Sequence, residues 1–264
     1  GLDVTGYDFS RLAVWQAYLQ ESILRDLSFV SSDLSGSVFG DVFAMVLEVA
    51  FSPDGRLLAA GDGTGQIRLW DISRGQQILS FHGHEDAVWS VSFSPDSRYV
   101  LAGDSKRTAR LLDVSTGKEV MTFTQTSNLR PGSKSKSDSG YIYAAIFSPD
   151  GKYVVTSGYG AAVMWDVQTG REIRTFQGHS DMIRSVGFSL DGRYMATGGE
   201  DKTVKVWEVA TGRNIVSFKE PTHAVKSVGL SPDGTYAVTG NEYGTVRFYD
   251  ISTGRVIWTS GRGD

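Results

Sequence analysis

The stretch FSPDG, residues 51–55, decides the fold of this chain because it returns at nearly regular intervals. Its variants begin at Phe93, Phe147, Phe188 and Leu230, so successive copies lie 42, 54, 41 and 42 residues apart. A fixed period of this size is typical of repeat architectures, in which each copy is one structural unit. The sequence therefore predicts five related units in series.

The residues around each motif predict four short strands. Alternating runs precede and follow it, such as VWSVSF at 88–93 and YMATGG at 194–199. A β-branched run ending in an aromatic residue and an acid comes next, such as IRLWD at 67–71, and a run such as QILSF at 77–81 closes the unit. Pro, Asp and Gly in the motif favour a tight turn. Turn signals at this spacing indicate a four-stranded antiparallel meander.

A single meander of this kind cannot bury both of its faces, but copies stacked around an axis can. The fold class predicted is therefore all-β, a β-propeller of five four-stranded antiparallel blades. The chain could close as a five-bladed ring or form an arc of a larger ring, and we expect the arc. The propeller is expected over residues 42–264, with units at 42–81, 82–123, 124–176, 177–218 and 219–260.

The order Gly-His, Ser-Pro-Asp-Gly and Trp-Asp resembles the WD-repeat family over residues 42–260. The resemblance implies a hydrogen-bonded tetrad inside each blade, which has a structural role. The fourth unit carries all four members, as His179, Thr197, Asp201 and Trp207. The other units depart from this pattern: Thr64 replaces the acid in the first, Lys106 and Leu112 replace the acid and Trp in the second, and Tyr243 and Tyr249 do so in the fifth.

A different rhythm precedes the propeller, because every fifth residue from Val4 to Phe39 is apolar. Helices need spacings of three and four, and strands need two. Residues 2–41 resemble the pentapeptide-repeat family, which implies a short right-handed β-helix of two coils and a first domain at 1–41. We expect this segment to cap or couple, while the propeller presents the binding surface.

Composition narrows the functional classes. The 264 residues carry a net charge of −4 and contain no cysteine. An acidic balance argues against nucleic-acid binding, and no apolar run approaches the roughly 20 residues of a membrane span. The absence of cysteine excludes thiolate metal sites and fits a cytoplasmic location. We expect no cofactor and no metal site, since phosphate-binding and zinc motifs are absent.

One shared position in the first strand of each unit is a candidate partner-binding site. It holds Leu47, Trp89, Tyr143, Arg184 and Lys226 in the five units. In WD-repeat propellers this position is expected near the mouth of the central channel, where aromatic and Arg residues make binding hot spots. The alternative is that these side chains pack between neighbouring blades.

The long connection 124–140 is a second candidate, because it is locally basic and lengthens the third unit. Arg130, Lys134 and Lys136 lie in it among Ser and Gly residues. Long loops in compact domains are often functional or unstructured. A partner contact and a solvated insert both remain open.

These features predict a non-catalytic scaffold or sensor module that binds a protein or peptide. The order of parts resembles the sensor half of bacterial NB-ARC-type signal-transduction ATPases, which implies a role in signal transduction and contact with other domains of a longer chain. The alternative is a five-bladed propeller hydrolase acting on carbohydrate. That reading needs several carboxylates on the first strands, where the sequence offers only Glu48.

Overall fold

The structure is a computed structural model that describes residues 45–126, 140–220 and 223–260. The chain divides into two compact units, Gly1–Ala44 and Met45–Asp264. The predicted pentapeptide segment at 1–41 lies outside the described residues, as do Arg130, Lys134 and Lys136. The account below concerns the second unit.

The described part of the second unit consists of strands joined by turns, and each blade is an antiparallel meander in chain order. Blade 1 comprises β1 (Val46–Phe51), β2 (Leu57–Asp62), β3 (Gln66–Asp71) and β4 (Gln76–His82). Blade 2 comprises β5 (Val88–Phe93), β6 (Tyr99–Asp104), β7 (Thr108–Asp113) and β8 (Glu119–Thr124). Blade 5 comprises β16 (Val225–Leu230), β17 (Tyr236–Asn241), β18 (Val246–Asp250) and β19 (Arg255–Ser260).

Blades 3 and 4 share one strand, which differs from the separate fourth and first strands that the sequence suggested. Strand β12 (Glu172–Phe188) pairs with β11 through its first part and with β13 through Ile183–Phe188. The two blades thus form one seven-stranded sheet. Their remaining strands are β9 (Ala145–Phe147), β10 (Tyr153–Ser157), β11 (Tyr159–Asp166), β13 (Tyr194–Gly199), β14 (Thr203–Glu208) and β15 (Asn214–Lys219).

The Ser-Pro-Asp-Gly turns form as their chemistry predicts. In blade 1 the Ser52 hydroxyl donates to Asp54 at 2.6 Å and accepts the Leu57 amide at 2.9 Å. Gly55 has a φ of +72°, which a residue without Cβ adopts at little cost. Leu190 replaces Pro in blade 4, yet Ser189 and Asp191 still make the same bond at 2.7 Å. The serine and aspartate therefore define this turn more than the proline does.

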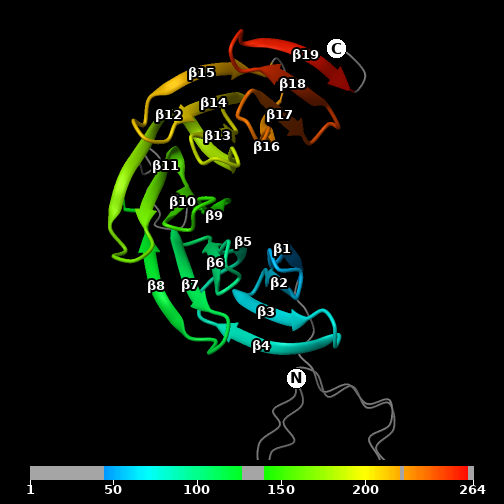
Figure 1. Cartoon of the computed structure of the whole chain (residues 1–264), viewed down its shortest axis with the longest axis vertical. Helices are drawn as coiled ribbons and strands as arrows, with labels where there is room; N and C mark the ends of the chain where they lie inside the picture. The colour runs from blue at the N-terminus through cyan, green and yellow to red at the C-terminus, as the bar shows by residue number, and fades with distance from the viewer. Residues whose placement is uncertain (1–44, 127–139, 221–222, 261–264) are drawn as a thin grey trace, which may run out of the picture. The chain divides into compact units, whose positions relative to one another are not determined.

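The hydrophobic cores lie between blades. One cluster joins β2 and β3 to the strands of blade 2, and Ile67, Leu69, Val88 and Val100 are buried in it. Three further clusters follow at the junctions of blades 2 and 3, 3 and 4, and 4 and 5. Figure 1 shows the blades following one another in chain order, with β4, β8, β15 and β19 on the outer side. Each interior blade is therefore held by two apolar faces.

Among the described residues there is no helix that is long and apolar enough to cross a membrane.

Candidate partner-binding site

Aromatic side chains from blades 2 and 3 meet beside the first strands. The Trp89 ring, on β5, lies edge-on to the Tyr143 ring at a centroid distance of 5.3 Å and to the Tyr141 ring at 6.0 Å. Tyr141 and Tyr143 stack at 5.2 Å. The Trp89 indole also donates to the Ser105 hydroxyl at 2.8 Å. All three rings are half-buried, so they present aromatic surface while their orientation is fixed.

Charged side chains continue this line across blades 4 and 5. The Arg184 guanidinium lies 3.8 Å from the centre of the Tyr143 ring, which is a cation–π contact. Arg184 also donates to Glu200, and the Lys226 ammonium lies 3.0 Å from the same carboxylate. Lys226 makes a second ion pair with Glu242 at 3.3 Å. We call the line formed by Trp89, Tyr143, Arg184 and Lys226, with Tyr141, Glu200 and Glu242 between and beside them, the first-strand row.

Arg184 and Lys226 also lower the pKa of the Glu200 carboxyl. Burial alone would raise the pKa of Glu200, but hydrogen bonds from Lys226 and Arg184 outweigh it and lower that pKa. Burial raises the pKa of Tyr143. Glu200 is therefore an anion that links two cations at neutral pH, and Tyr143 keeps its proton.

The contacts of the row fit both readings of this position, so its role in binding a partner stays a prediction. The four side chains predicted from the sequence contact one another or share a carboxylate across blade boundaries, and they stay partly exposed. Leu47 occupies the same position on β1 without a polar or aromatic side chain to extend the row. Tyr141 and Glu200 were missed by the sequence reasoning.

The predicted tetrad in blade 4 forms a continuous hydrogen-bonded chain. His179 Nδ1 lies 2.9 Å from the Asp201 carboxylate, and His179 Nε2 lies 2.7 Å from the Thr197 hydroxyl. The Trp207 indole donates to the same hydroxyl at 2.9 Å. Burial would raise the pKa of Asp201, but the bond with His179 and further donors hold it far below its usual range. His179, Thr197 and Trp207 are buried, which agrees with the structural role that was expected of these residues.

Blade 5 makes an equivalent hydrogen-bonded connection without a histidine. Glu220 is 2% exposed and accepts from the Thr239 hydroxyl at 2.6 Å and from the Tyr249 hydroxyl at 2.7 Å. Arg247 donates to the other carboxylate oxygen. Sequence reasoning noted Tyr249 but missed Glu220. The sequence held a signal for Glu220, because Thr239 and Tyr249 stand at the tetrad positions of Thr and Trp and had no hydrogen-bond partner assigned.

Blade 3 uses a glutamine in the same way. The Thr156 hydroxyl accepts from the Trp165 indole at 2.9 Å and lies 3.2 Å from Gln125 Oε1. Gln125 and Glu220 each lie two residues after the phenylalanine of a fourth strand, at the position where Gly83 and Gly178 precede His84 and His179. A long polar side chain at this glycine position therefore replaces the histidine.

Blade 2 corrects the assignment of its acid. The sequence put Lys106 where the family has an aspartate, but Asp104 supplies the carboxylate and lies 2.8 Å from His84 Nδ1. His84 Nε2 has no hydrogen-bond partner among the described residues. The cause is local, because Ala102 and Leu112 occupy the threonine and tryptophan positions of this blade. Blade 2 therefore keeps half of the tetrad.

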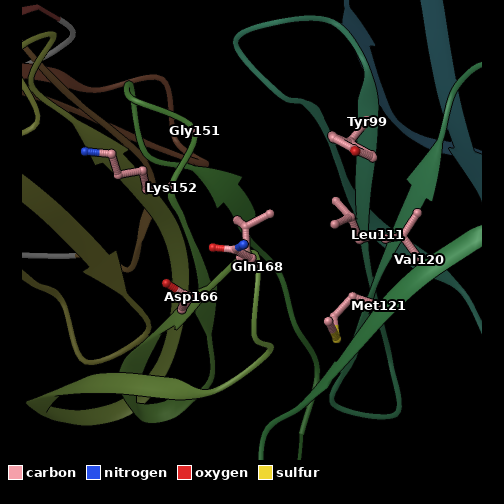
Figure 2. Close-up of a pocket in the computed structure, with 9 residues that line it drawn as sticks. Tyr99, Leu111, Val120, Met121, Gly151, Lys152, Asp166 and Gln168 are labelled. Atoms are coloured by element: carbon pink, nitrogen blue, oxygen red, sulfur yellow. The ribbon is translucent and has the colours of Figure 1, made fainter.

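A groove between blades 2 and 3 is a site that the sequence did not indicate. Its volume is about 480 Å³. Figure 2 shows Tyr99, Leu111 and Met121 on one side of it, with Lys152 and Asp166 across from them. At the next blade junction the residue corresponding to Met121 is Arg174, whose guanidinium bonds the Val209 carbonyl at 2.6 Å. The shorter thioether side chain makes no such polar bridge, and the groove between blades 2 and 3 has an apolar side on blade 2 and a mixed, partly charged side on blade 3.

Features for chemistry are sparse in the described ranges. Glu48 lies on β1, and burial raises the pKa of its carboxyl. No group of three or more His, Asp and Glu side chains in residues 45–126, 140–220 and 223–260 is arranged to hold a metal ion. No observation favours the carbohydrate hydrolase.

Comparison with known proteins identifies the family. The profile described as "WD domain, G-beta repeat" matches residues 29–71, 75–113, 131–166, 170–208 and 212–250. These five matches cover more than half of the chain, so the chain belongs to the WD-repeat family. The first match overlaps the segment 2–41 that resembles pentapeptide repeats, and that resemblance stays a prediction.

Relatives share shorter segments. An uncharacterised WD repeat-containing protein of Nostoc sp. is 46% identical over 87 residues, which is 33% of this chain and 7% of that protein. A second Nostoc protein of the same description is 35% identical over 83 residues, 31% of this chain and 5% of that protein. The target of rapamycin complex subunit wat1 of Schizosaccharomyces pombe is 36% identical over 61 residues, 22% of this chain and 19% of that subunit.

Membership of the family carries a general function. WD-repeat proteins generally act as protein-interaction scaffolds and are typically non-catalytic. The all-β architecture of four-stranded antiparallel sheets agrees with WD-repeat blades.

Proposed function

We propose that this chain is a docking platform whose first-strand row binds a protein segment. The observation that carries the proposal is the continuity of the row, from the Trp89–Tyr143 ring contact through Arg184 and Glu200 to Lys226. A surface built in this way is already ordered before a partner arrives. Little side-chain entropy is then lost on binding, which favours affinity.

The two ends of the row suit different parts of a partner. Trp89, Tyr141 and Tyr143 offer flat apolar area with fixed orientation, which suits an apolar or aromatic side chain. At the other end Arg184 and Lys226 face Glu200 and Glu242, so the charges alternate and nearly balance. A partner segment with one apolar anchor followed by polar residues fits this order.

The narrower form of the proposal assigns the platform to the sensor half of a larger cytoplasmic signalling protein of bacterial type. The resemblance of the order of parts to NB-ARC-type signal-transduction ATPases supports it, and so does the size of the Nostoc relatives, of which the matched segments are a small share. Other domains of the same longer chain would then receive the signal. No role for nucleic acid or a membrane enters this proposal.

The test is a quantitative pull-down with the wild-type chain, Trp89→Ala and Arg184→Ala as baits. Proteins that bind the row should be recovered with wild type and lost with both variants. Arg213→Ala is the matched control, because its guanidinium is well exposed and pairs only weakly with Glu208 at 4.0 Å. Equal recovery of every captured protein by all four baits contradicts the proposal.

A further inference from the structure

One side chain distinguishes the junction of blades 2 and 3 from the next junction along the chain. Between blades 3 and 4, the Arg174 guanidinium crosses to the neighbouring blade and donates to the Val209 carbonyl at 2.6 Å. Between blades 2 and 3, Met121 occupies the register of Arg174. Val167 is the counterpart of Val209, because the amides of both valines make the same turn hydrogen bond. A thioether thus stands at one junction where the next has a guanidinium.

The space beside Met121 is open. A Cβ on Gly170 would lie 2.6 Å from Met121 Sδ, so the Met121 side chain ends against a turn of blade 3. The groove of about 480 Å³ remains beside it, and Val167 lines the blade 3 side. A second hollow of about 160 Å³ continues the groove and shares Tyr99, Gly151 and Val167 with it. A side chain from outside the chain can therefore enter this junction.

The blade 2 side of the groove suits the methylene chain of a long cationic residue. Figure 2 shows Tyr99, Leu111, Val120 and Met121 along this side. Long cationic side chains pack their methylenes on apolar surface of this kind and keep the charged end in polar surroundings. Tyr99 already has one cation beside it, since the Arg98 guanidinium lies 5.5 Å from the centre of its ring. This side therefore offers both apolar area and an aromatic ring to an arginine.

Carboxylates are gathered around the groove. Asp166 lines the groove itself, and Asp96 and Asp150 line the hollow that continues it. The Thr169 hydroxyl lowers the pKa of Asp166. Burial would raise the pKa of Asp96 and of Asp150, but hydrogen bonds, led by that of the serine two residues earlier, outweigh it and lower both pKa values. All three side chains are therefore anions at neutral pH.

Two cations stand among these carboxylates. The Lys152 ammonium lies 3.5 Å from the Asp150 carboxylate, and Figure 2 shows it directed away from the blade 2 side of the groove. Arg98 is the other cation, beside Tyr99. Three carboxylates against two cations leave a local charge of −1. This balance favours a cationic occupant.

We propose that the groove between blades 2 and 3 binds an arginine side chain of a partner protein. Its methylenes pack on Leu111 and Met121, and its guanidinium donates to Asp166 and to the Val167 carbonyl. Arg174 makes the equivalent carbonyl bond from within the chain at the next junction. Arginine is preferred to lysine, because its planar fork donates to a carboxylate and a carbonyl together. The site uses no residue of the first-strand row, so it does not depend on the proposed function.

Methyl NMR of the whole chain tests this, with N-acetyl-arginine amide as the probe. Four residues supply methyl groups that line the groove and should shift until the probe saturates the site: Leu111, Val120, Met121 and Val167. The methyl groups of Leu69 and Val206, at the register of Leu111 in blades 1 and 4, should not shift. N-acetyl-lysine amide, the matched cation without a planar fork, should need about threefold more probe for half saturation.

Two pairs of variants locate the bound guanidinium. Asp166→Asn should weaken probe binding about threefold, whereas Glu208→Gln, at the equivalent end of β14, should leave it unchanged. Met121→Arg supplies a guanidinium from the chain itself and should abolish the response of Leu111 and Val167, whereas Met121→Leu should keep it. Asp166→Asn carries the test alone if Met121→Arg fails to give the circular dichroism spectrum of wild type.

Three results overturn the proposal. Groove methyl groups that stay unshifted up to the solubility limit of the probe show that the groove takes no guanidinium. An equal response to the arginine and lysine amides, or shifts that extend to Leu69 and Val206, shows general attraction to an acidic surface. A folded Met121→Arg variant that binds the probe as wild type does places the probe outside the groove.

Discussion

At the residue scale, blades 4 and 5 form an equivalent buried hydrogen-bonded connection from different side chains. Blade 4 connects Asp201, His179, Thr197 and Trp207, whereas blade 5 makes an equivalent connection through Glu220. In each case a buried threonine hydroxyl on the second strand, Thr197 or Thr239, takes part in the hydrogen-bonded connection. Buried polar groups need such partners because an unsatisfied one destabilises the fold by roughly 1–3 kcal/mol. The residues that make this connection vary from blade to blade, and in blade 2 the buried His84 Nε2 has no partner among the described residues.

The indole bond of blade 4 predicts a measurable loss. Trp207→Phe removes the donor to Thr197 in a site where the side chain is 3% exposed. We expect the free energy of unfolding from urea titration to fall by about 1–2 kcal/mol, which covers the bond and the lost ring area. Trp89→Phe, which removes the bond to Ser105 at a half-exposed site, should cost less. Equal losses for the two variants would contradict this ranking.

The carboxylate of blade 5 predicts a larger effect. Glu220→Ala leaves Arg247, Tyr249 and Thr239 without their shared acceptor in a buried site. Breaking a buried ion pair from one side typically costs about 3–5 kcal/mol. Gln125→Ala removes an uncharged partner at the corresponding position and should cost about 1 kcal/mol. Urea titration of both variants measures the difference, and a smaller loss for Glu220→Ala than for Gln125→Ala would show that the buried charge is not needed.

At the element scale, the turns between the third and fourth strands of blades 1 and 2 share a left-handed glycine but have different neighbouring atoms. Gly75 and Gly117 have φ values of +61° and +68°, so an alanine is strained by about 1 kcal/mol in either turn. A Cβ on Gly117 would also lie 2.5 Å from Leu79 Cδ1, whereas a Cβ on Gly75 meets no atom within 4 Å. The pair therefore separates backbone strain from packing.

This pair gives a matched prediction. Gly117→Ala should lower the free energy of unfolding more than Gly75→Ala, by about 1–3 kcal/mol, because overpacking is added to the same backbone strain. Thermal and urea unfolding measure both variants. In a Leu79→Ala background, the further loss of unfolding free energy caused by Gly117→Ala should be close to the loss caused by Gly75→Ala, because the clashing methyl group is gone. Identical effects of the two glycine variants would mean that blades 1 and 2 do not pack as described.

Much of the element layout could be predicted from the sequence, and the exceptions have physical reasons. Turn chemistry and alternation gave the strands, since Ser-Pro-Asp-Gly and the alternating runs act locally. The continuous strand β12 could not be foreseen, because residues 177–182 carry a Gly-His signal that ordinarily marks a loop. The roles of Glu220 and Asp104 also depended on distant partners, Tyr249 and His84, which lie 29 and 20 residues away in sequence.

For the candidate site, the sequence predicted which side chains share one strand position but not whether they would touch. Trp89, Tyr143, Arg184 and Lys226 come from different repeats, so the repeat period alone aligned them. Their contacts depend on the packing of adjacent blades, which the period does not determine. Glu200 joins two of them from a loop, and a loop carboxylate has no sequence pattern that reveals its partner.

At the scale of the whole molecule, the repeated turn aspartates predict acid sensitivity. The Ser231 hydroxyl, followed by the Thr235 amide, holds the pKa of Asp233 at about 2, and the Ser52 hydroxyl lowers the pKa of Asp54 in the same way. A carboxyl with a lowered folded pKa stabilises the fold fully above its unfolded pKa, near 3.9. That stabilisation is lost as the pH falls through the folded value.

The urea midpoint should therefore stay nearly constant from pH 7 to about pH 5 and then fall between about pH 4 and pH 2. Replacing Asp233 with Asn removes one titrating group, so the variant should start less stable at pH 7 and lose less on acidification. Midpoints measured at both ends of this range give the comparison. An unchanged midpoint at about pH 2.5 would contradict a stabilising role for these carboxylates.

The shared strand β12 has a consequence for anyone who divides the molecule into shorter pieces. A cut inside Glu172–Phe188 divides one continuous strand, and only a cut between Met182 and Ile183 leaves the pairs to β11 in one product and the pairs to β13 in the other. A cut between His82 and Val88 passes between two strands instead. A fragment boundary between blades 3 and 4 therefore has one suitable position, whereas the boundary between blades 1 and 2 has several.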